Sequence, residues 1–221
     1  MVEELIILQE YEMAIRPAWS VIDGKVKSKE FEFAWSGGFA ISQKQKNIKA
    51  LHQAIREVTG ENALEISSKS TDLIGTQLSA FSMKLNGLYL ENIFQSSKRY
   101  ENGGPYMDLL NVEPKEAKRD ERHKTSGRLL SFVNGDEEWP LESKTAFYDY
   151  IYVSAVIENF GHDLNLSGYT WFTDIEFNPQ KSINCQARAI TIYKSMQEMN
   201  LWDVVLATDT WIDFHKRYVE E

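Results

Sequence analysis

Apolar positions follow two different periods in the first part of the chain. On either side of Asp23-Gly24 they alternate with polar positions, which predicts two strands joined by a tight turn, a β-hairpin. The run 42–60 instead spaces its apolar residues as one face of a helix does, beginning with Ile48 and Leu51, and Gly60 is the expected end. The sequence therefore predicts a hairpin followed by one amphipathic helix.

The polar face of this expected helix carries four cations, Lys44, Lys46, Lys49 and Arg56. A solvated surface is the ordinary reason for such a pattern, and contact with phosphates is the functional alternative. His52 lies beside the apolar stripe, where packing is a more common role for histidine than catalysis.

Short apolar runs predict two further strands, at 5–8 and 63–67, and Arg16-Pro17 is expected to break the chain between the first run and the hairpin. Together these elements give a β-rich portion over residues 1–66.

The segment 89–100 follows the turn signal Asn86-Gly87 and returns to a helical pattern. A helix there places Glu91, Gln95 and Lys98 on one face, because they lie four and three residues apart. A carboxylate in the first turn of a helix is electrostatically favourable. The spacing alone fits equally well with a surface helix bearing one weak Glu–Lys pair.

The run 144–159 is almost wholly apolar or aromatic, which predicts a helix buried on most sides, and Asp149 within it needs a partner. Asn178-Pro179 predicts the start of a later helix with Lys181 and Ser182 near its N-terminus, where backbone amides favour anions.

The final segment, 201–221, is expected to form helical pieces that pack their tryptophans and leave His215 exposed. We therefore expect an α+β fold, predominantly helical, in which residues 1–66 pack as a β-rich extension on a helical domain formed by residues 67–221.

Composition narrows the functional classes. At 221 residues and 43% hydrophobic content, the chain is long enough to bury a full core. The net charge of −9 argues against a broad nucleic-acid surface but leaves room for a cleft that accepts one nucleotide. The single cysteine, Cys185, excludes an internal disulfide and fits a reducing cytoplasm. The four histidines are scattered, so we expect no metal, and nothing suggests a cofactor, a signal peptide or a membrane span.

Three strings carry a family resemblance: LSAF at 78–81, YLENIFQSSK at 89–98, and the residues around Asn184. They resemble the NADAR family, named for NAD and ADP-ribose and also called YbiA-like. This chain has Tyr89-Leu90 and Asn92 where short family members have Trp-Pro and His. Longer strings resemble the branch of NADAR antitoxins that are paired with DarT-type toxins, which ADP-ribosylate guanine in DNA; these strings are 42–52, 64–70, 101–106, 116–120, 139–141, 146–150 and 172–188.

The resemblance implies a NADAR fold and a hydrolase for the N-glycosidic bond between ADP-ribose and the guanine amino group, with a DarT-type toxin as partner. It implies catalytic roles for Glu91 and Lys98, and Lys98 could act either as a fixed charge or through a transient Schiff base. The residues expected to bind substrate are Ser79, Phe81, Gln95, Tyr106, Arg119, Trp139, Asp174, Lys181, Ser182 and Asn184.

Two other functions stay open at the level of sequence. The chain could bind ADP-ribosylated nucleic acid or a toxin without turnover. It could also be an N-glycosidase of a small nucleotide or a riboflavin-pathway intermediate, because short NADAR members are associated with such substrates.

Overall fold

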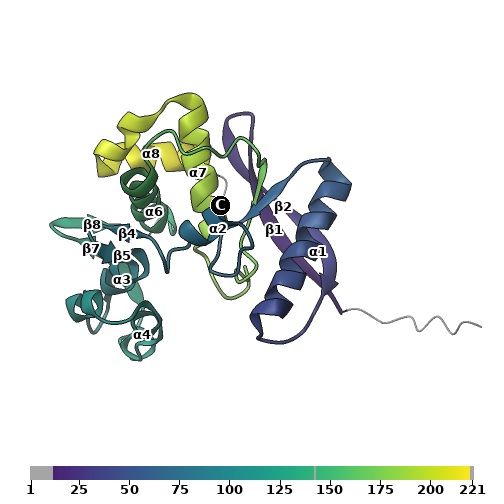
Figure 1. The fold of residues 1–221 in the computed structure, drawn as a ribbon. Helices are drawn as coiled ribbons and strands as arrows, with labels where there is room; N and C mark the ends of the chain where they lie inside the picture. The colour runs from purple at the N-terminus through teal and green to yellow at the C-terminus, as the bar shows by residue number, and fades with distance from the viewer. Residues whose placement is uncertain (1–11, 142, 220–221) are drawn as a thin grey trace, which may run out of the picture.

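The computed structural model describes residues 12–141 and 143–219, so the strand expected at 5–8 lies outside the described residues. Its elements confirm the α+β class with a β-rich N-terminal portion, and Figure 1 shows their arrangement. The N-terminal elements are β1 (Glu12–Ile22), β2 (Lys25–Trp35), α1 (Ile41–Thr59) and β3 (Ala63–Glu65).

The predicted hairpin is confirmed. β1 and β2 pair antiparallel along their whole length, and Asp23 and Gly24 both have positive φ, as the tight turn requires. Arg16-Pro17 does not break the chain as expected, because β1 runs through both residues. In an antiparallel pair, successive residues of a strand point their backbone N–H and C=O groups alternately toward and away from the partner strand. Counting from the Ile22–Lys25 pair that closes the hairpin, the backbone nitrogen of Pro17 faces away from β2, so no hydrogen bond to β2 is lost there.

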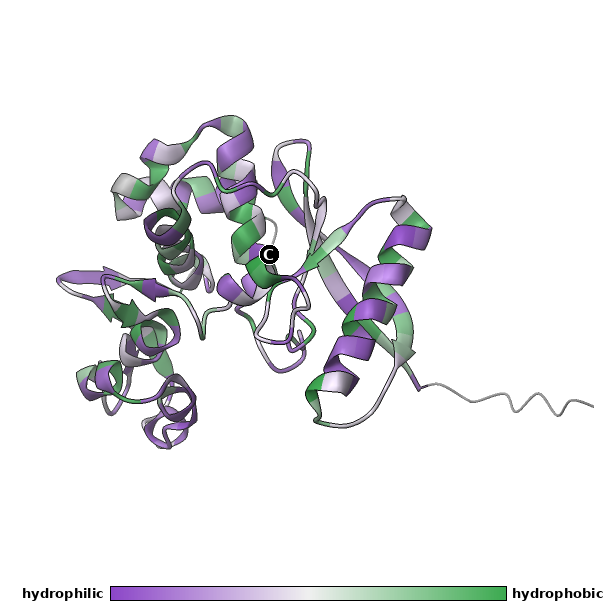
Figure 2. Cartoon of the chain, in the orientation of Figure 1, coloured by the Kyte–Doolittle hydropathy of each residue, from purple (hydrophilic) through white to green (hydrophobic). Residues whose placement is uncertain are grey.

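A strand from late in the chain completes the N-terminal sheet. β9 (Trp171–Thr173) lies between β1 and β3, giving the strand order β2-β1-β9-β3. It pairs parallel with β3 and touches β1 at Trp19 and Phe172. α1 packs on this sheet through Ile48 and Leu51 on its predicted apolar face, while Figure 2 shows hydrophilic residues along much of the helix.

The middle of the chain forms short elements around a second, three-stranded sheet of order β6-β7-β8. The helix expected over 89–100 is shorter than predicted: α3 ends at Ser96, and Lys98 opens a strand. The elements are α2 (Leu73–Gln77), β4 (Lys84–Leu85), β5 (Leu88–Tyr89), α3 (Leu90–Ser96), β6 (Lys98–Tyr100), η1 (Met107–Asn111), α4 (Pro114–Arg119), α5 (Arg122–Thr125), β7 (Leu129–Asn134) and β8 (Glu137–Trp139).

In the C-terminal part, several helices pack around the helix that the sequence predicts to be buried. Figure 2 shows that this central helix is largely hydrophobic. These elements are α6 (Ala146–Phe160), α7 (Gln186–Met199), η2 (Trp202–Leu206) and α8 (Thr208–Tyr218). α7 starts at Gln186, so the helix expected directly after Asn178-Pro179 begins several residues later. In the described part of the chain, every helix lacks the length or the apolar content to cross a membrane.

Asp149 on α6 has the partners that its burial requires. It accepts two hydrogen bonds from the Arg188 guanidinium of α7, both at 3.2 Å, and lies 2.9 Å from His215 Nε2 of α8. His215 is therefore buried, which corrects the expectation that it is exposed. Burial alone would raise the pKa of Asp149, but Arg188 and His215 outweigh it and hold this pKa below its ordinary value.

Candidate functional site

A cavity of about 590 Å³ lies where α3, α4, α6 and the segment leading into α7 meet. This volume is in the range of small-molecule sites. Nine of the twelve residues singled out in the sequence line it: Ser79, Phe81, Glu91, Gln95, Lys98, Asp174, Lys181, Ser182 and Asn184. The structure thus brings together residues that are spread over about half of the chain.

A chain of hydrogen bonds joins the three residues of the predicted polar face. Gln95 Nε2 donates to Glu91 Oε1 at 2.8 Å, and Lys98 Nζ donates to Gln95 Oε1 at 2.6 Å. Glu91 lies in the first turn of α3 with 5% of its surface exposed. The amide therefore links an almost buried carboxylate to an ammonium inside one cavity.

The position of Glu91 is fixed from two sides. Its N–H donates to the Ala80 carbonyl at 3.4 Å, and the Leu90 N–H donates to the Met83 carbonyl at 3.1 Å, so the 79–83 turn caps α3. Asn92 Nδ2 donates to the carbonyl of Val112 at 2.7 Å and so ties the connection before α4 to the same helix. All seven residues of α3 are buried, and the carboxylate is held in place by packing.

Lys98 has an altered protonation equilibrium. Burial lowers its pKa to about 8; the Glu91 carboxylate opposes this shift and the Lys118 ammonium adds to it. Its Nζ lies 4.8 Å from the centroid of the Phe94 ring. Lys98 is therefore expected to lose its proton at a lower pH than a solvated lysine does.

Lys118 of α4 lies at the cavity, although the sequence pointed to its neighbour Arg119. Its Nζ is 3.9 Å from Glu91 Oε1 and 5.1 Å from the centroid of the Phe81 ring. Its side chain is 57% exposed, so the ammonium can also reach solvent or a ligand at the cavity rim. Adjacent residues on a helix point about 100° apart, and only the contacts of α4 decide which one faces the site.

Asp174 is held by the turn that also caps α3. Its Oδ2 accepts from Gln186 Nε2 at 3.1 Å, and Gln186 Oε1 accepts from the Ala80 N–H at 2.7 Å. The Glu176 N–H donates to Asp174 Oδ1 at 3.1 Å. Burial raises the pKa of Asp174, an effect that the hydrogen bond from Gln186 partly offsets.

A second buried acid, Glu65 of β3, interacts electrostatically with Asp174. It was not among the site residues predicted from the sequence. Thr173 Oγ1 donates to Glu65 Oε2 at 2.7 Å, and His52 Nε2 lies 2.8 Å from the same hydroxyl oxygen. Burial raises the pKa of Glu65 and the Asp174 carboxylate raises it further, while burial lowers the pKa of His52 to about 4. The available signal was a carboxylate within the short strand predicted at 63–67.

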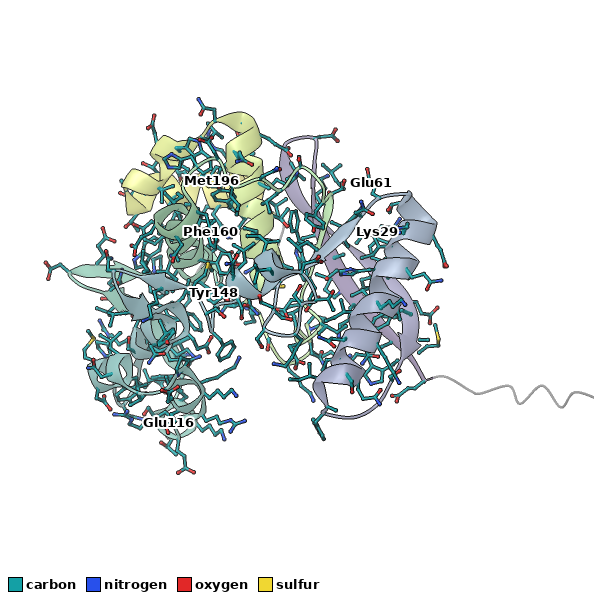
Figure 3. The ribbon with its side chains drawn as sticks, in the orientation of Figure 1. Lys29, Glu61, Glu116, Tyr148, Phe160 and Met196 are labelled. Carbon is teal, nitrogen blue, oxygen red and sulfur yellow. The ribbon has the colours of Figure 1, made fainter. Side chains whose placement is uncertain are left out.

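Aromatic side chains form the apolar part of the cavity. The Phe94 and Tyr148 rings meet edge to face with centroids 5.2 Å apart, and Phe81, in the 79–83 turn, also lines the cavity. Tyr148, labelled near the centre of Figure 3, comes from the buried helix α6 and was not singled out in the sequence. These rings offer flat apolar surfaces beside the polar groups.

The segment before α7 supplies polar atoms in a different way from the one expected. Lys181 and Ser182 are exposed on a turn closed by the Asn178 carbonyl, and they do not belong to a helix N-terminus. Asn184 Oδ1 is buried and has no hydrogen-bond partner among the described residues. An unpaired buried carbonyl oxygen at a cavity is suited to accept a hydrogen bond from a ligand.

Three of the residues expected to bind substrate do not line the cavity. Trp139 is fully buried in the core beside Tyr150, and Tyr106 bonds the Ser126 hydroxyl with the Arg122 guanidinium over its ring. Arg119 is exposed at the end of α4. The sequence and its family resemblance suggested these three residues for the site, whereas the packing of the chain places them away from the cavity.

The fold and the cavity together define an α+β protein with a cleft suited to a small, charged molecule. A family model described as DarT1-associated NADAR antitoxin matches residues 14–221, and the chain belongs to this family. Membership of this family supports an antitoxin role with a DarT toxin. The NADAR family is associated with hydrolase activity of the N-glycosidase kind. Comparison with curated proteins gives no match. Among the described residues, no group of three or more His, Cys, Asp or Glu side chains is arranged to hold a metal ion.

Proposed function

We propose that the protein hydrolyses the N-glycosidic bond between ADP-ribose and the amino group of guanine in DNA, and thereby reverses the modification made by its toxin. The observation that carries this proposal is the line of hydrogen bonds from Glu91 through Gln95 to Lys98 inside a cavity of about 590 Å³. An acid–base group and an amine of lowered pKa, fixed side by side, are the parts that glycosidic cleavage through a covalent intermediate requires.

In the proposed first step, the neutral amine of Lys98 bonds to C1 of the attached ribose. The bond from C1 to the guanine nitrogen breaks, and its electron pair stays on guanine. Glu91 takes a proton from the attacking amine and delivers it to the departing nitrogen. The C1–O4′ bond of the ribose ring then breaks, its electron pair stays on O4′, and the remaining Nζ proton passes to O4′. The product of this step is a neutral Schiff base between Lys98 and the opened ribose.

In the second step, water adds to the imine carbon and gives a proton to Glu91. The C1–Nζ bond then breaks as both protons of the water reach Nζ, one of them through Glu91, which restores the neutral amine. The released aldehyde closes to free ADP-ribose. The sum of both steps consumes one water and returns every protein group to its starting state.

Several other residues that line the cavity are assigned to substrate binding. Phe81 and Tyr148 provide faces for a nucleobase. Lys118 and Lys181 supply positive charge for the diphosphate. Asp174 and Asn184, with Ser79, Gln95 and Ser182 nearby, hold ribose hydroxyls and orient the reacting groups.

The central test is Glu91→Gln, which keeps the shape and the bond to Gln95 but removes the proton acceptor. We expect removal of ADP-ribose from a modified oligonucleotide to slow by about 100- to 10,000-fold, the contribution typical of a positioned acid or base. Binding of free ADP-ribose is expected to persist. Glu198→Gln is the matched control, because this carboxylate pairs with Lys194 on the surface.

The same assay separates the other functions. Clearance of modified guanine by substoichiometric protein supports an enzyme, whereas clearance limited to one equivalent assigns a sequestering role. Turnover of a free base–ribose phosphate, with none on modified DNA, assigns a small-molecule N-glycosidase. Full activity of Glu91→Gln would remove this residue from the mechanism.

A further inference from the structure

A second hollow, of about 690 Å³, runs along the polar side of α1. It is lined by Lys46, Lys49 and Arg56 together with uncharged groups that include Gln45 and Thr71. Among the described residues that line it, none carries a carboxylate. We call this hollow, with the lining residues Lys46, Lys49 and Arg56, the α1 hollow.

The charges of the α1 hollow are available to a ligand. Lys46 and Lys49 are exposed, and among residues 12–141 and 143–219 neither ammonium has a carboxylate within 4.0 Å. Arg56 Nη2 donates to the neutral amide oxygen of Asn62 at 2.7 Å, which leaves the guanidinium charge uncompensated. The adjacent Glu57 is engaged by Gln53 at 2.8 Å. A local positive surface on a chain of net charge −9 favours a specific anionic ligand over general attraction of anions.

The α1 hollow lies close to the candidate active site, because one short segment of the chain lines both. Ser67 and Ser68 line the site cavity, and Thr71 of the same short segment lines the hollow. Four peptide steps, from 67 to 71, span at most about 14 Å. A nucleic-acid strand leaving the cavity therefore reaches the α1 hollow within about four nucleotides, at the 3.4 Å rise of one strand of duplex DNA.

An exposed aromatic ring lies in the loop just before the helix that carries the hollow. Phe39 is 99% exposed, in the Gly-rich loop that precedes α1, three residues before Ser42 of the hollow lining. An exposed phenylalanine gains nothing from folding. Aromatic rings next to cations are the usual means by which proteins bind single-stranded nucleic acid, because bases stack on the rings.

We propose that the α1 hollow binds phosphates of the DNA strand that flanks the modified guanine, while Phe39 stacks on a neighbouring base. The inference rests on the proposed function, because it takes DNA as the carrier of the ADP-ribose group. It adds a binding surface that favours a polynucleotide over a free modified nucleoside.

The test compares two substrates, a single-stranded oligonucleotide with one ADP-ribosylated guanine and ADP-ribosylated guanosine. We expect Lys46→Gln/Lys49→Gln to lower kcat/KM on the oligonucleotide about 10-fold or more through KM, because two phosphate contacts are lost. The logarithmic salt dependence is expected to become shallower by about 1.4, from roughly 0.7 for each lost contact. Phe39→Ala is expected to weaken oligonucleotide binding by roughly 5- to 100-fold. Activity on the nucleoside stays unchanged in both variants.

The matched control is Lys216→Gln/Arg217→Gln, which removes the same charge from exposed positions on α8. Figure 1 shows α8 on the opposite side of the molecule from α1. Equal loss on both substrates, or equal loss in the control, would overturn the proposal. Loss of toxin binding with DNA binding intact would also overturn it and assign the surface to a protein partner.

A binding measurement keeps this inference separate from the proposed function. Fluorescence anisotropy with an unmodified oligonucleotide reports on the α1 hollow whether or not the protein is a hydrolase. A wild-type protein that cleaves neither substrate refutes the proposed function, and weaker oligonucleotide binding by Lys46→Gln/Lys49→Gln would still support the α1 hollow. Unchanged binding in that variant refutes the α1 hollow whatever the catalytic result.

Discussion

At the scale of single residues, the protonation of Lys98 decides between two chemical roles. Its ammonium is placed 4.8 Å from the Phe94 ring centroid and bonded to Gln95, and burial lowers its pKa to about 8. A fixed charge would work best when this group is protonated. A nucleophile works only when it is neutral, and the lowered pKa favours that role.

We predict that the single-turnover rate rises with pH and levels off above about pH 8, since the neutral fraction of Lys98 grows through its pKa. Borohydride is expected to trap a covalent adduct with ADP-ribose, visible by mass spectrometry. Lys98→Arg should abolish both rate and adduct, because arginine stays charged. A rate that falls above pH 8, with no adduct, would assign Lys98 to electrostatic stabilisation instead.

Single residues also mark where sequence reasoning reached its limit. The spacing of Glu91, Gln95 and Lys98 correctly predicts that they lie together, although Lys98 reaches the group from a strand. Lys118 and Glu65 could not be found in this way. The first depends on how α4 is rotated, and the second on a pairing of strands more than a hundred residues apart.

At the scale of elements, three C-terminal helices meet at one buried group of charges. Asp149 of α6 faces Arg188 of α7 and His215 of α8, and Arg188 also bonds the Ile183 carbonyl in the segment that leads to Asn184. The same contacts that join the helices therefore fix one wall of the cavity.

Asp149→Asn is expected to reduce the free energy of unfolding by about 3–5 kcal/mol, because it removes the counter-charge of a buried guanidinium. Urea denaturation followed by circular dichroism measures the effect. Glu198→Gln breaks only a surface pair and should change stability by about 0.5 kcal/mol or less. Similar midpoints for the two variants would show that the buried charges contribute little.

Elements with strong local signals were predicted well from sequence. The hairpin around Asp23-Gly24, the helix ending near Gly60 and the apolar helix over 144–159 all form close to their expected bounds. The start of α7 was predicted too early, because the turn after Asn178-Pro179 closes on itself through the Asn178 carbonyl. Local propensity cannot separate such a turn from the first turn of a helix.

At the scale of the whole molecule, the β-rich portion and the helical portion share their cores. Trp19 of β1 packs edge to face on Phe177, with ring centroids 5.5 Å apart, and Leu64 and Ile66 belong to the cluster around α6 and α7. Residues 1–66 and 67–221 remain our proposed division of the chain, but the interface between them is an apolar one.

We predict that residues 67–221 produced alone will not unfold cooperatively, because they leave apolar surface that the N-terminal strands normally cover. Co-production with residues 1–66 as a separate chain is expected to restore a cooperative transition and hydrolysis. Calorimetry of the single and paired fragments provides the measurement. A sharp transition for 67–221 by itself would show that the N-terminal portion is dispensable for folding.

The position of β9 has a consequence for how the protein is made. This strand, Trp171–Thr173, fills the space between β1 and β3 and brings Asp174 to the cavity. During translation, β9 leaves the ribosome only after most of the chain has been synthesised. The sheet that contains the first hairpin therefore cannot be completed earlier. We therefore expect truncated nascent chains to give a cell no protection, so that resistance to the toxin follows the completion of each antitoxin molecule.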